Sequence, residues 1–224
     1  MTIDRSLIIF ENNELIIVHK PDNTSFHIDN DDAGFFNLVS EFTGIKLWPV
    51  HRLDKLTSGL IIFAKSASIA AELGKLFEQH KIKKTYLAIS DKKPKKKQGK
   101  IIGDMKKVRS GSWKLSNSKE NPAITHFFSH SIEAGKRLFW LEPKTGKTHQ
   151  LRVALKSIGS PILGDKRYSG SDADRGYLHA YKIEFSLLNK HYSFSALPLS
   201  GESFVSTNFQ DALKHLRVKA EKSS

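Results

Sequence analysis

Short apolar runs alternate with polar turns along most of this chain, and the pattern predicts more strands than helices. Alternating or continuous apolar residues between turn-forming residues are typical of strands. We expect strands near 6–10, 15–19, 60–64, 85–89, 123–129, 137–142, 181–187 and 191–196. Because polar turns join several neighbouring pairs, the pattern predicts an α+β fold with a mixed, mostly antiparallel central sheet flanked by helices.

Helical spacing of apolar residues predicts helices in four places. The first covers 35–42 and ends at Gly44, and the second follows a cap at Ser66 or Ser68. The last is expected near 211–216.

The third predicted helix ends at Gly159. Its apolar residues recur at helical spacing and are expected to form one buried face: Leu151, Ala154, Leu155 and Ile158. Arg152 lies off that face and is therefore free for a site.

The length of 224 residues suits one large domain or two small ones, and no internal repeat is visible. We expect a single domain over 1–218, with a basic loop or hairpin at about 91–118 and a frayed tail at 219–224. No apolar run approaches the roughly 18 residues of a membrane helix, and 1–12 does not resemble a secretory signal. The absence of cysteine excludes disulfides and thiolate metal sites. We therefore expect no membrane association and a cytoplasmic location.

The net charge of +13 is concentrated in one stretch. Residues 81–109 hold twelve Lys or Arg and two acids, which gives +10. Such a concentration favours a polyanion such as nucleic acid, because each neutralised phosphate releases counterions. A solvated, self-repelling loop is the alternative. Binding to an anionic membrane is disfavoured, because no apolar face accompanies the charges.

Motifs of several other enzyme classes are absent or incomplete. The stretch 145–148 resembles the end of a phosphate-binding loop, but Leu141 stands where the leading glycine should be. The histidines lack metal-ligand spacing, so we expect no metal site and no cofactor. His51, Asp54 and Ser58 are close in sequence, yet a hydrolase triad cannot be inferred from proximity in sequence.

Two longer motifs remain. Residues 51–59 read H-R-L-D-K-L-T-S-G, and 141–153 read L-E-P-K-T-G-K-T-H-Q-L-R-V. Both resemble the RluA-type family of RNA pseudouridine synthases, the first without a gap. Shorter matches at 20–21, 84–88 and 178–180 occur in the order of the family.

The chain also departs from the family pattern. His19 stands in place of the usual Asn, and Lys147 in place of an Arg, which keeps the charge but loses the bidentate fork. Ala154 and Ser160 replace residues that are His in many members. A separate N-terminal S4-like RNA-binding domain, present in some relatives, is not expected here, since 6–20 already belongs to the catalytic portion.

The resemblance implies an isomerase that needs no cofactor. Pseudouridylation breaks the uracil–ribose C–N bond, turns the base and rejoins it through carbon. The resemblance assigns the nucleophile to Asp54, and it assigns to Arg152 the cation that keeps this carboxylate ionised. It assigns Tyr86 to stacking on the base and makes it a candidate for removing the C5 proton.

Further residues are expected to contact the substrate. The residue that matches Arg52 is thought to help extrude the base from its stack. Lys83, Lys84 and Lys147 are expected to contact backbone phosphates, which position RNA without specifying sequence. We expect His51 to shape the loop rather than to react. The predicted partner is structured RNA, either tRNA or rRNA, bound by a monomer.

Two rival functions stay open at this point. The first is a non-catalytic RNA-binding protein on a synthase fold, which intact Asp54, Tyr86 and Arg152 argue against. The second is a hydrolase that uses Asp54 and His51, which would release free uracil from RNA, whereas an isomerase releases none.

Overall fold

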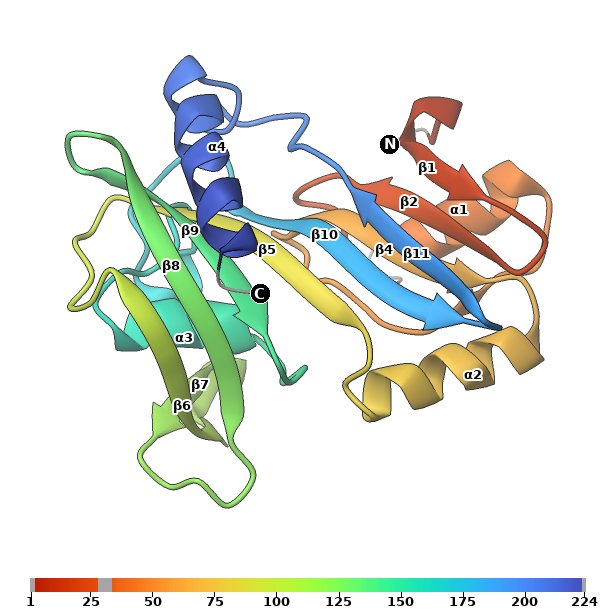
Figure 1. Cartoon of the computed structure of the whole chain (residues 1–224), viewed down its shortest axis with the longest axis horizontal. Coiled ribbons are helices and arrows are strands. Elements are labelled where there is room, and N and C mark those ends of the chain that lie inside the picture. The colour runs from red at the N-terminus through yellow and green to blue at the C-terminus, as the bar shows by residue number, and fades with distance from the viewer. Residues whose placement is uncertain (1–2, 28–33, 223–224) are drawn as a thin grey trace. The chain divides into compact units, whose positions relative to one another are not determined.

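A computed structural model describes residues 3–27 and 34–222, which group into two compact units (Figure 1). Unit 1 contains Met1–Lys84 and Ala180–Leu197, and unit 2 contains Thr85–His179 and Pro198–Ser224. The boundary falls inside two strands, β5 (Lys83–Ser90) and β10 (Leu178–Leu187). The single domain over 1–218 stays a prediction.

Unit 1 is built on strands in the order β1-β2-β4-β10, with β11 beside β10 and β3 beside β4. Its further elements are η1 (Arg5–Leu7), β1 (Ile8–Glu11), β2 (Leu15–Lys20), α1 (Phe35–Thr43), β3 (Trp48–Pro49), β4 (Ser58–Ala64), α2 (Ala67–Glu78) and β11 (Lys190–Ser195). The β1–β2, β2–β4, β3–β4 and β10–β11 pairs are antiparallel.

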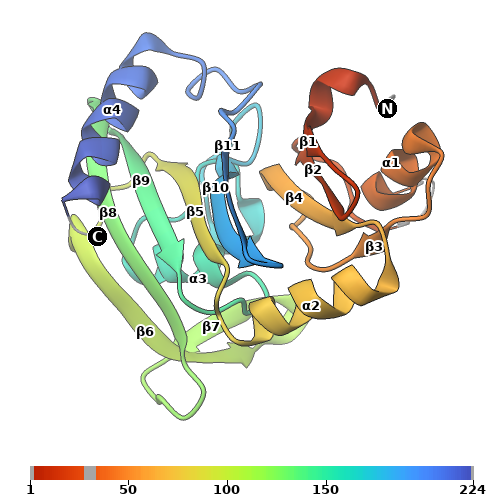
Figure 2. The same ribbon diagram turned by 45° about the vertical axis from the view of Figure 1, so that its right-hand side comes forward.

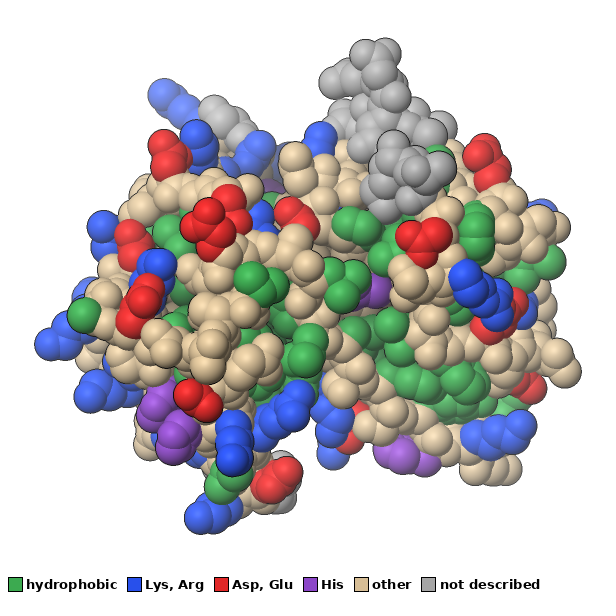
Figure 3. All heavy atoms as spheres, turned by 90° about the horizontal axis from the view of Figure 1, so that it is seen from above, with side chains coloured by type: hydrophobic (Ala, Val, Ile, Leu, Met, Phe, Trp, Pro, Cys, Tyr) green, Lys and Arg blue, Asp and Glu red, His purple; other side chains and the backbone are tan. Residues whose placement is uncertain are grey.

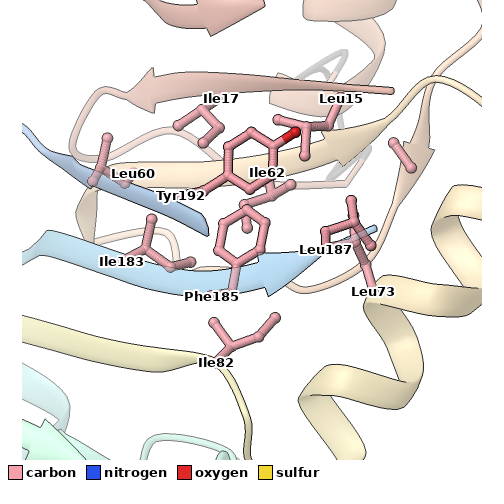
Figure 4. Close-up of a cluster of buried hydrophobic side chains, with 11 residues drawn as sticks. Leu15, Ile17, Leu60, Ile62, Leu73, Ile82, Ile183, Phe185, Leu187 and Tyr192 are labelled. Carbon is pink, nitrogen blue, oxygen red and sulfur yellow. The ribbon is translucent and has the colours of Figure 1, made fainter. Parts of the chain in front are cut away.

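Strand β4 explains why the run 60–64 is apolar without alternation. Both faces of the strand are covered, as in strands inside a layered fold. On one face, Leu60 and Ile62 pack with Leu73 of α2 and with side chains of β2, β10 and β11 (Figure 4). On the other face, the ring of Phe63 lies 5.5 Å from that of Phe36 in α1.

The residues predicted to end or begin helices and to form a turn in unit 1 do so. Gly44 ends α1 in the left-handed conformation, with φ of 68°. The side-chain oxygen of Ser66 accepts a hydrogen bond from the Ile69 N–H at 3.3 Å and caps α2. The predicted hairpin turn at 188–190 joins β10 to β11, with positive φ at Leu188 and Asn189.

Unit 2 contains an antiparallel set of strands in the order β5-β9-β8-β6-β7. Its further elements are β6 (Gln98–Lys107), η2 (Arg109–Gly111), β7 (Trp113–Ser116), β8 (Ala123–Glu133), β9 (Lys136–Pro143), α3 (Gln150–Ser157), η3 (Lys166–Tyr168) and α4 (Thr207–Glu221). Helices α3 and α4 lie on opposite faces of these strands (Figures 1 and 2). The chain therefore has the predicted α+β fold with a mixed, mostly antiparallel sheet.

Two parts of unit 2 were described only loosely by the sequence. The stretch predicted as a basic loop or hairpin contains strand β6, which begins at Gln98 and pairs antiparallel with β7. Helix α4 continues to Glu221, into the segment predicted to fray. Within that segment, Lys219 donates a hydrogen bond to the Gln98 side chain, and its amino group lies 5.6 Å from the ring centroid of Phe128. Residues 223–224 of the predicted tail lie outside the described residues.

Candidate active site

The proposed nucleophile, Asp54, lies half-buried in the loop between β3 and β4. Its main-chain carbonyl accepts a hydrogen bond from the Thr57 N–H at 2.9 Å, which closes a turn. Leu53 and Thr57 are buried on either side of Asp54, whereas Arg52 and Lys55 are exposed. The loop is thus anchored around Asp54 and presents Arg52 to solvent, where it remains a candidate for RNA contact.

The backbone requires a glycine at position 59, the last residue of the motif at 51–59. Its φ is 110°, and a Cβ atom there would lie 2.3 Å from the carbonyl oxygen of Ala180 in β10. Residues with a side chain rarely adopt that conformation and have no space here. Glycine therefore allows β10 to lie close beside β4 just after the loop of Asp54.

His51 supports the loop through packing. Its Nε2 accepts a hydrogen bond from the Ile62 N–H at 3.0 Å, and its ring lies 4.7 Å from that of Phe77. Burial, followed by the positive charge of Lys84, lowers the pKa of His51 to about 3. His51 is therefore neutral near pH 7 and uses its lone pair to hold β4. This geometry supports the predicted role in shaping the loop.

The low pKa of His51 predicts a pH-dependent stability. In the unfolded chain the pKa of histidine is about 6.5, so stability from neutral His51 is complete above that pH and is lost as pH falls toward 3. His51→Gln retains an acceptor but does not titrate. From pH 7 to pH 5 the wild type should lose about 2 kcal/mol more unfolding free energy than this variant.

Urea titrations at the two pH values measure this difference. His191→Gln, at an exposed position of β11, is the control and should track the wild type. An equal loss in wild type and His51→Gln would show that folding does not lower the pKa of His51.

Lys20, the last residue of β2, connects this strand to the loop of Asp54. Its side chain is fully buried, and its amino group donates to the carbonyls of Pro21, Thr24 and Lys55 at 2.8, 2.7 and 3.2 Å. An ammonium group has three donor hydrogens, one for each carbonyl. Because Lys55 follows Asp54 directly, Lys20 fixes the backbone beside the proposed nucleophile. The sequence indicated Lys20 only as part of a family motif.

Lys20→Met should therefore destabilise the protein by about 2–4 kcal/mol, because buried carbonyls lose their donors. Lys55→Met is the matched control, since it removes an exposed lysine from the same loop and leaves the Lys55 carbonyl in place. Urea unfolding at pH 7 measures both variants. Equal midpoints for the two would refute the structural role of Lys20.

The two lysines that begin β5 differ in exposure. Lys83 is exposed, as expected of a phosphate contact. Lys84 is half-buried, with its amino group 5.6 Å from the ring centroid of Phe77, and burial lowers its pKa. Substrate contact by both lysines remains a prediction.

Tyr86 also lies in β5, within unit 2. The strand pairs with β9 so that Tyr86 is opposite Leu141. Tyr86 is half-buried, whereas its neighbours Thr85 and Leu87 are buried, as expected for side chains that alternate between faces. Its contact with the base remains a prediction.

The prediction that α3 buries only one face is wrong. All residues from Gln150 to Leu155 are buried, including Arg152, which is 5% exposed. Periodicity marks the apolar residues only, whereas the two polar residues are buried because each has hydrogen-bonding partners of its own.

Arg152 is held by a bidentate ion pair. Its Nε and Nη2 donate to the two carboxylate oxygens of Asp165 at 2.7 and 2.8 Å, and its guanidinium lies 4.9 Å from the ring centroid of Tyr168. The Tyr168 hydroxyl is 2.7 Å from Nδ1 of His149, the residue before α3. Arg152 therefore has a fixed orientation. The motif comparison included Asp165 but gave it no role.

Gln150 organises the loop that leads into α3. Its side-chain oxygen, Oε1, accepts hydrogen bonds from the Thr145 hydroxyl at 2.7 Å and from the Lys147 N–H at 3.0 Å. Its amide nitrogen donates to the Ile124 carbonyl and the Thr125 hydroxyl of β8, both at 3.0 Å. Gln150 thus clamps the loop of Lys147 to the sheet, a role that sequence reasoning missed.

The side chain of Lys147 is half-buried and has a defined partner. Its amino group donates to Asn121 Oδ1 at 2.7 Å, and Asp104 in turn accepts from the Asn121 N–H at 3.0 Å. This network orients the lysine that replaces the arginine usual in the family motif. Phosphate contact by Lys147 remains a prediction.

The described residues contain neither a metal-ligand cluster nor a membrane-spanning helix. Within 3–27 and 34–222, no three His, Asp or Glu side chains lie close enough together to hold a metal ion. Over that described part of the chain, no helix is long and apolar enough to cross a membrane.

Comparison with known proteins gives one consistent result. The family model described as RNA pseudouridylate synthase matches residues 14–157. A Haemophilus influenzae protein named as an uncharacterized RNA pseudouridine synthase is 53% identical over 88% of this chain and 90% of its own length. Ribosomal large subunit pseudouridine synthase C of Rickettsia bellii is 33% identical over 82% of this chain and 65% of its own length.

A solved structure agrees on the fold. Human RNA Pseudouridylate Synthase Domain Containing 1 superimposes with a TM-score of 0.74 over 94% of both chains, at 19% identity.

Proposed function

This chain belongs to the RNA pseudouridine synthase family and is therefore an isomerase that acts on RNA, and we propose that it uses Asp54 as its nucleophile on specific uridines of structured RNA. The observation that carries the proposal is the position of Asp54 in an anchored loop inside the matched range 14–157. Tyr86 and Arg152, the other proposed catalytic residues, lie in the same range.

The proposed roles follow from the bonds that change. The C1′–N1 bond breaks and a C1′–C5 bond forms, while the C5 proton leaves and N1 gains a proton. The Asp54 carboxylate attacks C1′ as the C1′–N1 bond breaks, and it leaves again when C5 of the turned base bonds to C1′. The Arg152 guanidinium keeps the Asp54 carboxylate ionised, and Tyr86 stacks on the base and takes the C5 proton. Arg152 is suited to its role because Asp165 fixes the direction of its guanidinium.

A hydrolase that uses His51 as a base is disfavoured. A general base needs a free lone pair, and the Nε2 lone pair of His51 is already used by the Ile62 N–H. Proton transfer from water would require this hydrogen bond to break.

We propose that the RNA target is rRNA or tRNA. We also propose that the protein acts in the cytoplasm and binds this RNA as a monomer. The R. bellii relative is named for the large ribosomal subunit, so rRNA is the first substrate to test. Carbodiimide adduct mapping of RNA from a strain that lacks this gene would identify the uridine by a missing adduct stop.

The activity itself is tested by incubating purified protein with bulk RNA from that strain. We expect new carbodiimide stops and no free uracil. Free uracil would favour a hydrolase. Tight RNA binding without any product, across both tRNA and rRNA, would favour a non-catalytic RNA-binding protein.

A further inference from the structure

The segment Asp91–Lys97, which we call the lysine loop, joins β5 to β6 in unit 2 and carries uncompensated charge. It contains five lysines, all exposed: Lys92, Lys93, Lys95, Lys96 and Lys97. Among the described residues, only Lys92 pairs with an acid, Asp91, at 3.8 Å. In Figure 3, basic side chains stand out along the left side of the molecule, over unit 2.

The first half of the loop is anchored to both flanking segments. The Lys92 N–H donates to the Ser90 hydroxyl at 3.2 Å, at the end of β5. The Lys92 carbonyl accepts a hydrogen bond from the Ser160 hydroxyl, and Ser160 is fully buried just after α3. Pro94 is also buried. Ser160 therefore anchors the loop in this chain.

The second half of the loop is anchored as well. The Lys95 N–H donates to the Ile158 carbonyl at 2.9 Å, at the C-terminal end of α3. The Lys97 carbonyl accepts from the Ser129 hydroxyl at 2.8 Å, in β8. The negative end of the α3 dipole lies beside the loop and offsets part of the repulsion among its lysines.

Holding several like charges in a fixed arrangement costs free energy that a solvated loop would avoid by moving. We propose that the lysine loop is a preorganised surface that binds the sugar–phosphate backbone of the RNA substrate. The inference rests on the proposed function for the identity of its partner. Every exposed side chain from Lys92 to Lys97 is a lysine, so the loop offers no apolar group to a membrane.

The hydrogen bond between Lys95 and Ile158 places the lysine loop along α3. Ile158 lies six residues after Arg152, which corresponds to about 9 Å along a helix axis. The loop therefore lies within unit 2 toward the opposite end of α3 from the proposed catalytic arginine. Backbone contacts there position the RNA and carry no sequence information.

The first test removes charge. Lys93, Lys95, Lys96 and Lys97 are changed together to Gln, and RNA binding is measured over a KCl series. The control changes four exposed lysines elsewhere to Gln, with the same loss of charge: Lys46, Lys190, Lys214 and Lys222. The slope of log affinity against log salt should fall by about 3 in the loop variant, since four phosphate contacts are lost and each removes about 0.7–0.9. The control should change it by less than about 1.

The second test removes an anchor without removing charge. Ser160→Ala should weaken RNA binding about threefold, because the lysines lose their fixed arrangement. Ser157→Ala is the control, since its hydroxyl donates to the Ala154 carbonyl within α3 and does not touch the loop. Circular dichroism confirms that both variants fold.

The proposal is overturned if the loop variant and the charge control have equal salt slopes. It is also overturned if the loop variant keeps full RNA affinity but loses binding to polyglutamate, which would indicate an acidic protein partner. Binding is measured without turnover, so these outcomes are independent of pseudouridine formation. A wild type that binds RNA through the loop yet forms no product would refute the proposed function alone.

Discussion

Asp54→Asn should abolish pseudouridine formation, with a loss of about 10⁴-fold or more in single-turnover rate, because an amide cannot replace a nucleophilic carboxylate. The substitution conserves shape, and the hydrogen bond that closes the turn uses the main-chain carbonyl of Asp54 rather than its side chain. The turn that carries residue 54 should therefore persist in the variant.

Asp22→Asn provides the matched control. Asp22 is also a half-buried aspartate in a turn of unit 1. Its variant should keep the wild-type rate, measured by carbodiimide mapping of product in a transcript that contains the target uridine. A rate for Asp54→Asn within tenfold of the control would mean that another group is the nucleophile.

Asp165→Asn should cost about 3–5 kcal/mol of unfolding free energy, because it replaces the charged, bidentate acceptor of the buried Arg152 guanidinium with a neutral amide. The two side chains are 6% and 1% exposed, so water cannot compensate. Asp172→Asn is the control, since Asp172 pairs with Lys166 at the surface, where both side chains are about 80% exposed. That change should cost less than about 1 kcal/mol.

A double variant separates the structural role of Arg152 from its catalytic role. Arg152→Met with Asp165→Leu replaces the buried pair with apolar groups, which can recover the stability lost by removing one partner. We expect recovered stability in urea titrations and no pseudouridine formation. Recovery of both properties would show that Arg152 serves the fold alone.

Local features of unit 1 could be predicted because their causes lie within a few residues. Gly44 ends α1 and Ser66 caps α2 through hydrogen bonds to residues nearby in sequence. The run 60–64 was recognisable as a buried strand from its apolar residues alone. Short-range spacing carries this information directly.

Features that depend on distant partners could not be predicted in the same way. Arg152 is buried because Asp165 faces it, and a helical period cannot indicate a partner 13 residues away. The amino group of Lys20 reaches the Lys55 carbonyl, 35 residues away. In the last part of α4, the Lys219 side chain contacts Gln98, 121 residues away.

The candidate site also contains positions that the sequence indicated and supporting contacts that it did not. The family resemblance indicated the positions Asp54, Tyr86 and Arg152, whose catalytic roles remain predictions. The groups that hold those positions in place, among them Lys20, Gln150 and Asp165, became visible only through their contacts. A motif records which residues occur together, but it does not record which atoms they contact.

Release of the C5 hydrogen tests the central claim most directly, since isomerisation replaces the C5–H bond of uridine with a carbon–carbon bond. RNA carrying tritium at C5 of uridine is incubated with wild-type protein and with Asp54→Asn. We predict that the wild type releases tritium to water, forms an equal amount of pseudouridine and releases no uracil, and that Asp54→Asn releases no tritium. Equal tritium release by the two proteins, or free uracil in place of pseudouridine, would contradict the account.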